Sequence, residues 1–445
     1  LFIVSIKEVV KVKITIAGLG YIGLVHAVCF AEVGHEVTCI DEDHEKVKFL
    51  QSGELFFYEK KVSELMEKNK SRLHFTNEKE AAYKCADLIM ITAPADIEED
   101  GSSSIRSVYE VIYEAAEYLE KDCFIIIKTA VPVGTNDKAE RVMRERLAND
   151  VYIEFVSNPD FLRLGNAVND LWNASHVVIG AESEAAEVVM RKVYEGFHLP
   201  FVIINRRSAE LLTYAANGML SVQIGFMHEL ANICEVVGAN IEDVTRGMDW
   251  EDRIAKEFVQ TCLGYGEIPY IKESKSLEYF SNLHKVDTKT LSASIETSEL
   301  QKWRLLNKGR NYYSTYADVT IAILGVSCKS GTDDIDCAPA LSYTKLLLEE
   351  GGKVKIWDPA AIDHFKKIYS NEVTYCRTIK ETISGADLCF ILTQWPDIKY
   401  FDVYEFAEYM KCPIVIDAVN CYSLCDIEEA GIVYESIGRR MIDSR

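Results

Sequence analysis

The chain has 445 residues, 48% of them hydrophobic, and a formal net charge of −22 at pH 7. This length predicts two or three domains rather than a single core. An acidic excess of this size repels phosphate backbones and anionic bilayers, so nucleic acid and membrane are excluded as expected partners.

The thirteen cysteines occur without a CxxC pair, and Cys39, Cys123 and Cys389 lie in apolar, strand-like runs. Such a pattern is typical of buried, reduced thiols in a reducing compartment. The leading apolar run ends at Lys7, too early for a secretory h-region or a membrane span. We therefore expect a soluble, cytoplasmic protein without a disulfide framework.

Strand-like runs alternate with amphipathic helical stretches over roughly the first 205 residues. "VKITIAGLG" is followed by a predicted helix over 21–33, and "ADLIMITAP" by another near 106–120. Two further runs, "HVVIGA" and "FVIINR", close this region. This alternation is typical of βαβ units around a parallel sheet.

The pattern changes at residue 208, where apolar positions recur at helical spacing for some thirty residues before Gly238. We predict one long helix here. Because so much of it is apolar, it is best buried between domains or against a second subunit.

From residue 318 the first pattern returns as an internal repeat. "VTIAILG" echoes "ITIAGLG", and "GADLCFILTQWPD" echoes "CADLIMITAPAD". The repeat predicts an α/β protein with two doubly wound, Rossmann-like domains joined by a long central helix. We expect domain boundaries at 1–205, 206–305 and 306–445, with ligands in a cleft between the two α/β domains.

Gly18-x-Gly20-x-x-Gly23 follows a predicted strand and opens a predicted helix, and Asp41 ends the next strand. The first glycine permits a tight turn, the second a close approach to a pyrophosphate, and the third helix–strand packing, while the carboxylate binds ribose hydroxyls. The pattern predicts dinucleotide binding. Because Asp41 is followed by Glu42 and Asp43 without a nearby arginine, it favours NAD over NADP.

The second half lacks this fingerprint. Its "SCKSGTDD" loop offers Lys329 and backbone amides to a different phosphate ligand. A solvated loop lysine is the equally simple alternative.

Seven motifs occur in one order along the chain: "GLGYIGL", "KTAVPVGT", "NPDFLRLGNAVND", "AELLTYAAN", "GYGEIPYIKE", "KSGTDDI" and "DPAA". Together they resemble the UDP-glucose/GDP-mannose dehydrogenase family over nearly the whole sequence. The resemblance implies NAD-dependent oxidation of the C6 alcohol of a nucleotide sugar to a carboxylate. It also implies a homodimer built on the long central helix, and a UDP-linked sugar as ligand.

The resemblance assigns roles to individual positions, none of them in a metal site. The implied catalytic positions are Asp160, Asn217 and Glu273. The implied NAD-binding positions are Gly18, Gly20, Tyr21, Ile22, Gly23, Asp41, Lys46 and Thr129. The implied substrate-binding positions are Phe161, Leu162, Arg163, Tyr265, Gly266, Lys272 and Lys329.

The chain departs from the family pattern where the chemistry is concentrated. The nucleophilic cysteine falls on Pro269, and the lysine that stabilises the oxyanion falls on Thr213. Leu164 replaces a glutamate, and Asp336 and Val419 replace two arginines. Cys262 is the nearest thiol in sequence, but its apolar run is typical of a packing cysteine.

Two hypotheses follow from these substitutions. In the first, the chain binds NAD and a UDP-sugar but is impaired or inactive in the four-electron oxidation. In the second, it is an active NAD-dependent UDP-sugar dehydrogenase with rearranged residues, and a single hydride transfer assisted by Asp160 or Glu273 ends at the aldehyde. A β-hydroxyacid-type dehydrogenase is a weaker third option, because that class lacks a second α/β domain.

Overall fold

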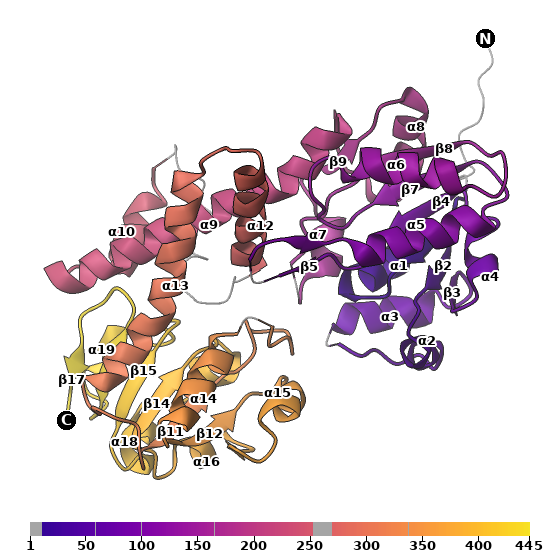
Figure 1. Ribbon diagram of the computed structural model, residues 1–445. Helices are drawn as coiled ribbons and strands as arrows, with labels where there is room; N and C mark the ends of the chain where they lie inside the picture. The colour runs from indigo at the N-terminus through magenta and orange to yellow at the C-terminus, as the bar shows by residue number, and fades with distance from the viewer. Residues whose placement is uncertain (1–10, 58, 99, 164, 252–268, 337) are drawn as a thin grey trace. The chain divides into compact units, whose positions relative to one another are not determined.

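The computed structural model describes residues 11–445 apart from 58, 99, 164, 252–268 and 337 (Figure 1). The chain divides into two compact units, Leu1–Ala216 and Asn217–Arg445. The strands of the first unit's main sheet are β1 (Lys13–Ala17), β2 (Glu36–Ile40), β3 (Leu73–Thr76), β4 (Leu88–Ile91), β7 (Cys123–Ile127), β8 (Ile153–Ser157), β9 (Val177–Gly180) and β10 (Phe201–Ile204). Their order is β10-β9-β8-β7-β4-β1-β2-β3. Neighbours pair in parallel except β8 and β9, which meet only at Ser157 and Gly180.

The helices of this unit are α1 (Tyr21–Glu32), α2 (His44–Gln51), α3 (Lys60–Lys68), α4 (Lys79–Tyr83), α5 (Arg106–Tyr118), α6 (Thr135–Arg146), α7 (Ala167–Trp172), α8 (Glu184–Val193) and the short 3-10 helix η1 (Glu195–Phe197). A small hairpin joins β5 (Asp96–Ile97) to β6 (Ser103–Ser104). Helices α1 and α5 confirm the predictions for 21–33 and 106–120, each ending within two residues of the expected position.

Strand residues of the first unit alternate between two cores. Leu88 and Met90 of β4 pack in the core that contains α1 and α8, whereas Ile89 and Ile91 pack in the core that contains α5 and α6. Successive side chains of a strand point to opposite faces, so an apolar run such as β4 must be covered on both sides. The doubly wound architecture follows from that requirement.

The second unit repeats the architecture with a seven-stranded sheet. Its strands are β11 (Thr320–Leu324), β12 (Lys353–Trp357), β13 (Thr374–Tyr375), β14 (Leu388–Ile391), β15 (Ile414–Asp417), β16 (Val433–Ser436) and β17 (Ile442–Asp443). The order is β13-β12-β11-β14-β15-β16-β17, and only β16 and β17 pair antiparallel. The predicted pair of doubly wound domains is confirmed.

The helices that surround this sheet are α14 (Pro339–Glu349), α15 (Ile362–Tyr369), α16 (Ile379–Ile383), α17 (Pro396–Lys399), α18 (Tyr404–Tyr409) and α19 (Leu424–Ile427). In β14, Leu388 and Phe390 pack in one core and Cys389 and Ile391 in the other. The alternation seen in β4 is therefore reproduced in its repeat partner. Cys389, like Cys39 and Cys123, is buried as predicted.

Helix α9 (Arg206–Val237) is the predicted long helix, with 32 residues. It starts in the first unit and continues into the second, where α10 (Ile241–Met248), α12 (Pro269–Leu283) and α13 (Lys289–Arg310) follow. A Cβ at Gly225 of α9 would meet Ser294 of α13 at 3.0 Å, and the Ser294 hydroxyl donates to the Ser221 carbonyl at 2.5 Å. Small residues thus allow α9 and α13 to pack closely.

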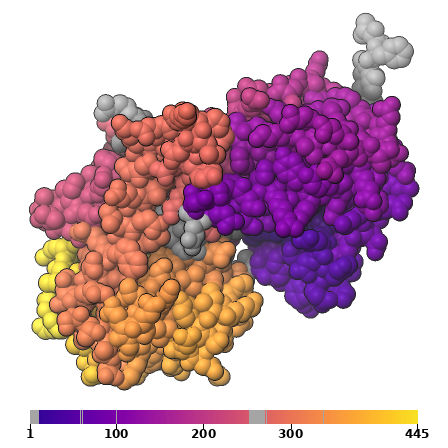
Figure 2. All heavy atoms as spheres, in the orientation of Figure 1, coloured from indigo at the N-terminus to yellow at the C-terminus, as the bar shows by residue number. Residues whose placement is uncertain are grey.

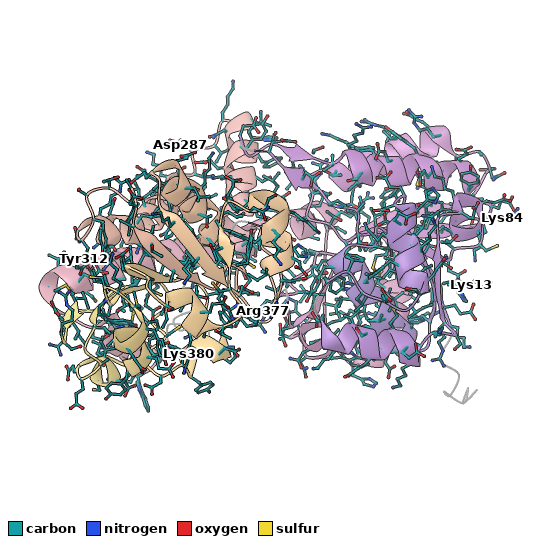
Figure 3. All side chains as sticks on the ribbon, turned by 90° about the horizontal axis from the view of Figure 1, so that it is seen from below. Lys13, Lys84, Asp287, Tyr312, Arg377 and Lys380 are labelled. Atoms are coloured by element: carbon teal, nitrogen blue, oxygen red, sulfur yellow. The ribbon has the colours of Figure 1, made fainter. Side chains whose placement is uncertain are left out.

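Exposed ion pairs occur on the outside of both units. Figure 2 shows all heavy atoms of one face, coloured along the chain as in Figure 1. Lys84 and Lys380, labelled in Figure 3, pair respectively with Glu120 at 3.0 Å and with Glu405 at 2.9 Å. Exposed pairs of this kind contribute little to stability. Within the described residues, no helix is long and apolar enough to cross a bilayer.

Candidate functional site

The glycine turn after β1 has the geometry that each glycine requires. Gly18 has φ +102°, and a Cβ there would lie 2.6 Å from the Ala93 nitrogen. A Cβ at Gly23 would lie 2.1 Å from the Gly18 carbonyl oxygen, so only hydrogen fits between α1 and the turn. A Cβ at Gly20 would meet nothing within 4 Å, because this residue faces open space at the start of α1.

Asp41 follows β2 and lies against this turn. Its Oδ2 accepts from the Leu19 amide at 2.8 Å and from the Lys46 ammonium at 3.0 Å, while Oδ1 accepts from the Asp43 amide at 3.0 Å. Lys46 is on α2 and is partly exposed. The acidic side chain is thus fixed beside the glycine turn with free lone pairs for ribose hydroxyls.

These residues fit a dinucleotide pyrophosphate. Gly20 is the N-cap of α1, which has no side-chain cap, so the first amides of the helix are available to an anion. Ile22 lies in the first turn of α1, and the Thr129 hydroxyl donates to the Ala93 carbonyl at 2.7 Å. The predicted NAD-binding positions are therefore brought together around one turn.

Tyr21 differs from the expectation in one respect, because its side chain turns away from the glycine turn. Its hydroxyl donates to Glu59 and accepts from the Gly165 amide at 2.7 Å. Only the backbone of Tyr21 is left for a pyrophosphate.

A buried polar cluster lies beneath the ends of β7 and β8. The Lys128 ammonium is 3.3 Å from the Asn158 amide oxygen and from the Tyr194 hydroxyl, and 3.8 Å from Asp160 Oδ2. The same carboxylate oxygen lies 3.7 Å from His26 Nε2. Lys128 and His26 are buried, whereas the Asp160 side chain keeps 16% exposure. Asp160 therefore faces a buried cation and a buried imidazole.

Burial controls the protonation of this cluster. It lowers the pKa of His26 to about 4, and nearby Lys128 lowers it further while Asp160 opposes the shift. Burial also lowers the pKa of Lys128, against the attraction of Asp160. The His26 Nδ1 donates to the Ile22 carbonyl at 2.9 Å, so the neutral ring presents a lone pair to Asp160.

The segment after Asp160 carries the predicted substrate residues of the first unit. Phe161 is 43% exposed, and Leu162 packs partly into the core that contains α1. The Arg163 guanidinium makes two hydrogen bonds to Asp170, at 2.7 and 3.0 Å, which close the segment around the start of α7.

Asn217 of α9 and Glu273 of α12 form a contact in the second unit, with the Asn217 amide donating to the Glu273 carboxylate. Burial raises the pKa of Glu273, and the Asn217 hydrogen bond opposes the shift. Thr213 precedes Asn217 by one helical turn and is buried. Lys272 lies on α12 and is exposed. The structure thus brings together two of the three predicted catalytic residues.

The loop after β11 contains Lys329, which is partly exposed. Acidic neighbours dominate this loop: burial raises the pKa of Asp334, the hydrogen bond from the Asp336 amide lowers it, and the charges of Asp336 and Asp333 raise it. Asp336 is exposed, and its amide donates to Asp334 at 2.8 Å. Val419 follows β15, and its amide donates to Asp417 at 2.8 Å.

Four residues named from the sequence lie outside the described residues: Leu164, Cys262, Tyr265 and Gly266. Pro269 is the first residue of α12.

Burial raises the pKa of eight of the described cysteines. They are Cys29, Cys39, Cys123, Cys234, Cys328, Cys376, Cys389 and Cys421. A thiol with a raised pKa is a poor nucleophile at neutral pH.

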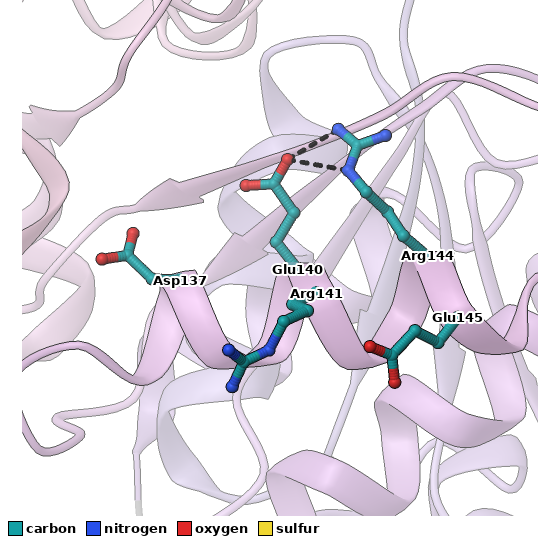
Figure 4. A pocket seen from close by; sticks show the side chains of 5 residues that line it. All are labelled: Asp137, Glu140, Arg141, Arg144 and Glu145. Atoms are coloured by element: carbon teal, nitrogen blue, oxygen red, sulfur yellow. Dashed lines mark hydrogen bonds and ion pairs between the residues drawn. The ribbon is translucent and has the colours of Figure 1, made fainter.

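A shallow surface hollow lies over α6, and it does not contain the predicted site residues (Figure 4). Its lining consists of Asp137, Glu140, Arg141, Arg144 and Glu145. Glu140 accepts two hydrogen bonds from Arg144, as the dashed lines show. The lining charges largely neutralise each other, and none of the predicted site residues belongs to it.

Sequence reasoning missed several buried polar residues near the site. Lys128 in "FIIIKTAV" was visible as a charge within an apolar strand, which is a signal for a buried partner. Glu210, on the first turns of α9, accepts from the Gly134 amide at 2.6 Å and from the Asn136 amide at 2.7 Å. No local pattern indicated that Glu210 would bind the start of α6.

Comparison with known proteins gives consistent results along the chain. Family models match three consecutive stretches: the NAD-binding domain of the UDP-glucose/GDP-mannose dehydrogenase family at 12–198, its central domain at 207–299 and its UDP-binding domain at 322–424. The prediction of NAD as cofactor is confirmed by the first of these matches together with the geometry of the glycine turn.

Individual relatives match over nearly their full length. UDP-glucose 6-dehydrogenase YwqF of Bacillus subtilis is 35% identical over 432 residues, covering 97% of this chain and 98% of the relative. TuaD of the same organism is 34% identical over 429 residues, covering 96% and 93%. The solved UDP-glucose dehydrogenase of Pyrobaculum islandicum is 26% identical, covers 97% of this chain and 99% of its own, and superposes with a TM-score of 0.90. The chain therefore belongs to the UDP-glucose/GDP-mannose dehydrogenase family.

Proposed function

We propose that this protein binds NAD and a UDP-linked sugar but does not complete the four-electron oxidation of the sugar's C6 alcohol to a carboxylate. The UDP-binding domain of the family supports the nucleotide part of the ligand. The names of the relatives make UDP-glucose the first sugar to test.

The observation that carries the proposal is the helical register of α12. Pro269 starts this helix, and Glu273, four residues later, accepts from Asn217 of α9. The resemblance assigns the nucleophilic cysteine to position 269 and the oxyanion-stabilising lysine to position 213, one turn before Asn217. Proline has no thiol and threonine has no positive charge.

The missing thiol affects only part of the reaction. Removing the first hydride from C6 requires NAD and a base for the hydroxyl proton. Removing the second requires a hydrated or thiol-bound aldehyde, which the family obtains from its cysteine as a thiohemiacetal. Without that nucleophile, we expect the second oxidation to slow by orders of magnitude.

One further substitution acts in the same direction. Asp336 adds a negative charge, where the resemblance expects an arginine, to the loop that carries Lys329. A diphosphate is repelled by this carboxylate. We therefore propose that the UDP-sugar is bound more weakly than in a family member with an arginine at position 336.

The alternative function is a two-electron UDP-sugar dehydrogenase. It is favoured by the raised pKa of Glu273, because a carboxyl group that exchanges protons nearer neutrality is a better acid–base catalyst. In that reaction the C6 hydroxyl would lose its proton to a carboxylate, and the C6 carbon would lose a hydride to NAD⁺. The products are the 6-aldehyde, NADH and one proton.

We also propose a homodimer that forms through α9. Five of its exposed apolar side chains, Met219, Phe226, Ile233, Val236 and Val237, recur at spacings of seven, seven, three and one residues. Such a stripe on one helix needs a partner surface. Sedimentation equilibrium tests this part: we expect a dimer for the wild type and a monomer for F226E/I233E, and a wild-type monomer would contradict it.

The proposal extends to the domain boundaries and to the cellular compartment of the protein. We place the three domains at 1–205, 206–305 and 306–445, and we propose a cytoplasmic setting because the buried cysteines are free thiols.

Calorimetric titration with NAD and UDP-glucose, together with the absorbance of reduced nicotinamide over time, tests the main proposal. We expect binding of both ligands, with no sustained turnover. Two NADH formed per UDP-glucose would refute the proposal. One NADH per sugar, with an aldehyde trapped by a hydrazine, would establish the alternative.

The converse experiment restores the missing groups in a P269C/T213K variant. We expect partial recovery of NADH formation, because Asp336 and Leu164 still oppose the substrate. The P269S/T213K variant is the matched control, because serine keeps the size of cysteine but lacks its thiolate. Equal recovery in both variants would show that the thiol is not the missing element.

A further inference from the structure

The side chain of Tyr21 connects the glycine turn to a different part of the first unit. Tyr21 is the first residue of α1, and its ring contacts Phe57 edge-on, with centroids 4.9 Å apart. Its hydroxyl donates to the Glu59 carboxylate and accepts from the Gly165 amide at 2.7 Å. Both partners are more than thirty residues away in sequence, so these contacts depend on the fold.

Glu59 completes the connection. Its side chain is buried, with 6% exposure for the residue, and it lies just before α3 without capping that helix. The second carboxylate oxygen is 3.5 Å from the Val168 amide in the first turn of α7. A buried carboxylate is costly unless hydrogen-bonded, so Glu59 depends on Tyr21 as its close donor.

The segment held by these contacts is 160–170, described except for residue 164. It includes Phe161 and Arg163, which the family resemblance assigns to the substrate. Arg163 bonds to Asp170 at the far side of the segment. Tyr21 and Glu59 therefore contact this segment at Gly165 and Val168, which lie between the two residues of the Arg163–Asp170 pair.

We infer that Tyr21 and Glu59 are positioning residues for the nucleotide-sugar ligand, and that the Tyr21 side chain serves that ligand rather than NAD. This rests on the proposed function, because it assumes that segment 160–170 binds the sugar nucleotide. The reason is geometric: the Tyr21 backbone belongs to the glycine turn, while its hydroxyl supports the Gly165 amide. Removing the hydroxyl leaves the turn intact and releases the segment.

The variants Y21F, E59Q and Y113F test this inference. Y113F removes a hydroxyl from an exposed tyrosine on α5 and serves as the control. Titration of each protein with UDP-glucose and with NAD gives two affinities per variant. We expect Y21F to weaken UDP-glucose binding about tenfold, as for a lost hydrogen bond to a charged group, with a several-fold smaller effect on NAD. E59Q keeps an oxygen acceptor for Tyr21, so we expect an intermediate loss.

A second measurement does not need the sugar nucleotide. Amide hydrogen exchange in the ligand-free protein should be about tenfold faster in peptides covering 160–170 of Y21F than of Y113F, with exchange elsewhere in the first unit unchanged.

The outcomes separate this inference from the proposed function. If the wild type does not bind UDP-glucose, the proposed function fails, and hydrogen exchange alone decides whether Tyr21 holds the segment. Unchanged exchange in Y21F would overturn the inference, and so would equal losses of NAD and UDP-glucose affinity. Faster exchange with unaltered UDP-glucose affinity would also overturn it, because the segment would then not position the ligand.

Discussion

Two glycine turns, one after β1 and one after β11, share a backbone geometry but differ in what binds their amides. Gly18 and Gly325 both have positive φ, and a Cβ there would collide with Ala93 or Thr393, each two residues beyond the end of the neighbouring strand. In the first turn Asp41 accepts from a single turn amide, that of Leu19. Gly20 remains open.

In the second turn the Asp358 carboxylate accepts hydrogen bonds from the turn amides. Its Oδ2 accepts from the amides of Val326 and Ser327 at 2.8 and 3.0 Å and from the Trp395 ring nitrogen at 3.1 Å. Its Oδ1 accepts from the amides of Ala360 and Ala361. Donors that could bind a phosphate are thus already satisfied by a carboxylate. The repeat therefore keeps the strand–turn architecture, while a single side chain occupies the amides of its second turn.

The largest effect should come from removing the carboxylate that closes the second turn. D358A leaves several buried N–H donors unpaired, at about 1 to 3 kcal/mol each, and should lower the free energy of unfolding by roughly 4 kcal/mol. D41A, the matched variant in the first turn, should cost much less stability and weaken NAD binding at least about tenfold. Urea denaturation and NAD titration distinguish the two. Similar stability losses would contradict the contrast between an open and a closed turn.

The next largest effect is a difference in stability between alanine variants at two glycines of the first turn. G23A forces a methyl group against the Gly18 carbonyl and should destabilise the protein by about 3 kcal/mol, whereas G20A meets no atom within 4 Å. We expect G20A to fold normally and to bind NAD poorly, because its methyl group occupies the approach of the pyrophosphate. Thermal melts with and without NAD measure both. A G20A protein that NAD stabilises as well as wild type would refute this.

The two units should also respond to pH in opposite senses, through His26 in the first and Glu273 in the second. His26 has a native pKa of about 4 against a usual 6.5, so the unfolded chain binds more protons between these values. Its stability contribution is complete above about pH 6.5 and is lost as the pH falls towards 4, by about 2 to 3 kcal/mol. The pKa of Glu273 is raised above its usual 4.5, so its contribution falls as the pH rises from that value.

Unfolding free energies from pH 4 to 7 of H26Q and E273Q check this. H26Q should remove part of the increase in unfolding free energy with rising pH. E273Q should remove part of the decrease that opposes it. A parallel shift of the whole wild-type curve by either variant would mean that the group does not titrate differently in the folded protein.

The smallest effect concerns Lys46, whose ammonium is 3.0 Å from Asp41 and partly exposed. K46Q should change NAD affinity only about two- to fivefold, since exposed pairs contribute below about 1 kcal/mol. K48Q, on the same helix with its ammonium bound to Glu45, is the control. A loss above about tenfold would assign Lys46 a direct contact with the cofactor.

Much of the first turn was predictable because its parts are contiguous. Three glycines at fixed spacing, a preceding strand and an acid at the end of the next strand define the geometry of Gly18, Gly20, Gly23 and Asp41 without tertiary information. The repeat likewise predicted the second sheet. What it did not predict is the role of Asp358, because "WDP" resembles "IDE" in sequence while its carboxylate accepts from both turn amides.

The buried cluster was unpredictable for a different reason. His26 is on α1, Lys128 directly follows β7, Asp160 is in the loop after β8, and Tyr194 directly follows α8. Their contacts depend on the order of strands in the sheet and on which core each helix joins. The same applies to Tyr21, where the fingerprint motif indicated a cofactor role and only the fold revealed the contact with Glu59.

The Glu210 carboxylate on the start of α6 limits where the chain can be divided. A fragment cut at residue 205 would lose this anion and leave the amides of Gly134 and Asn136 without their acceptor, and it would also lose Arg206, which bonds to Glu140. A fragment that extends to residue 216 keeps both. Anyone preparing the nucleotide-binding half as a separate reagent should therefore carry the opening turns of the long helix with it.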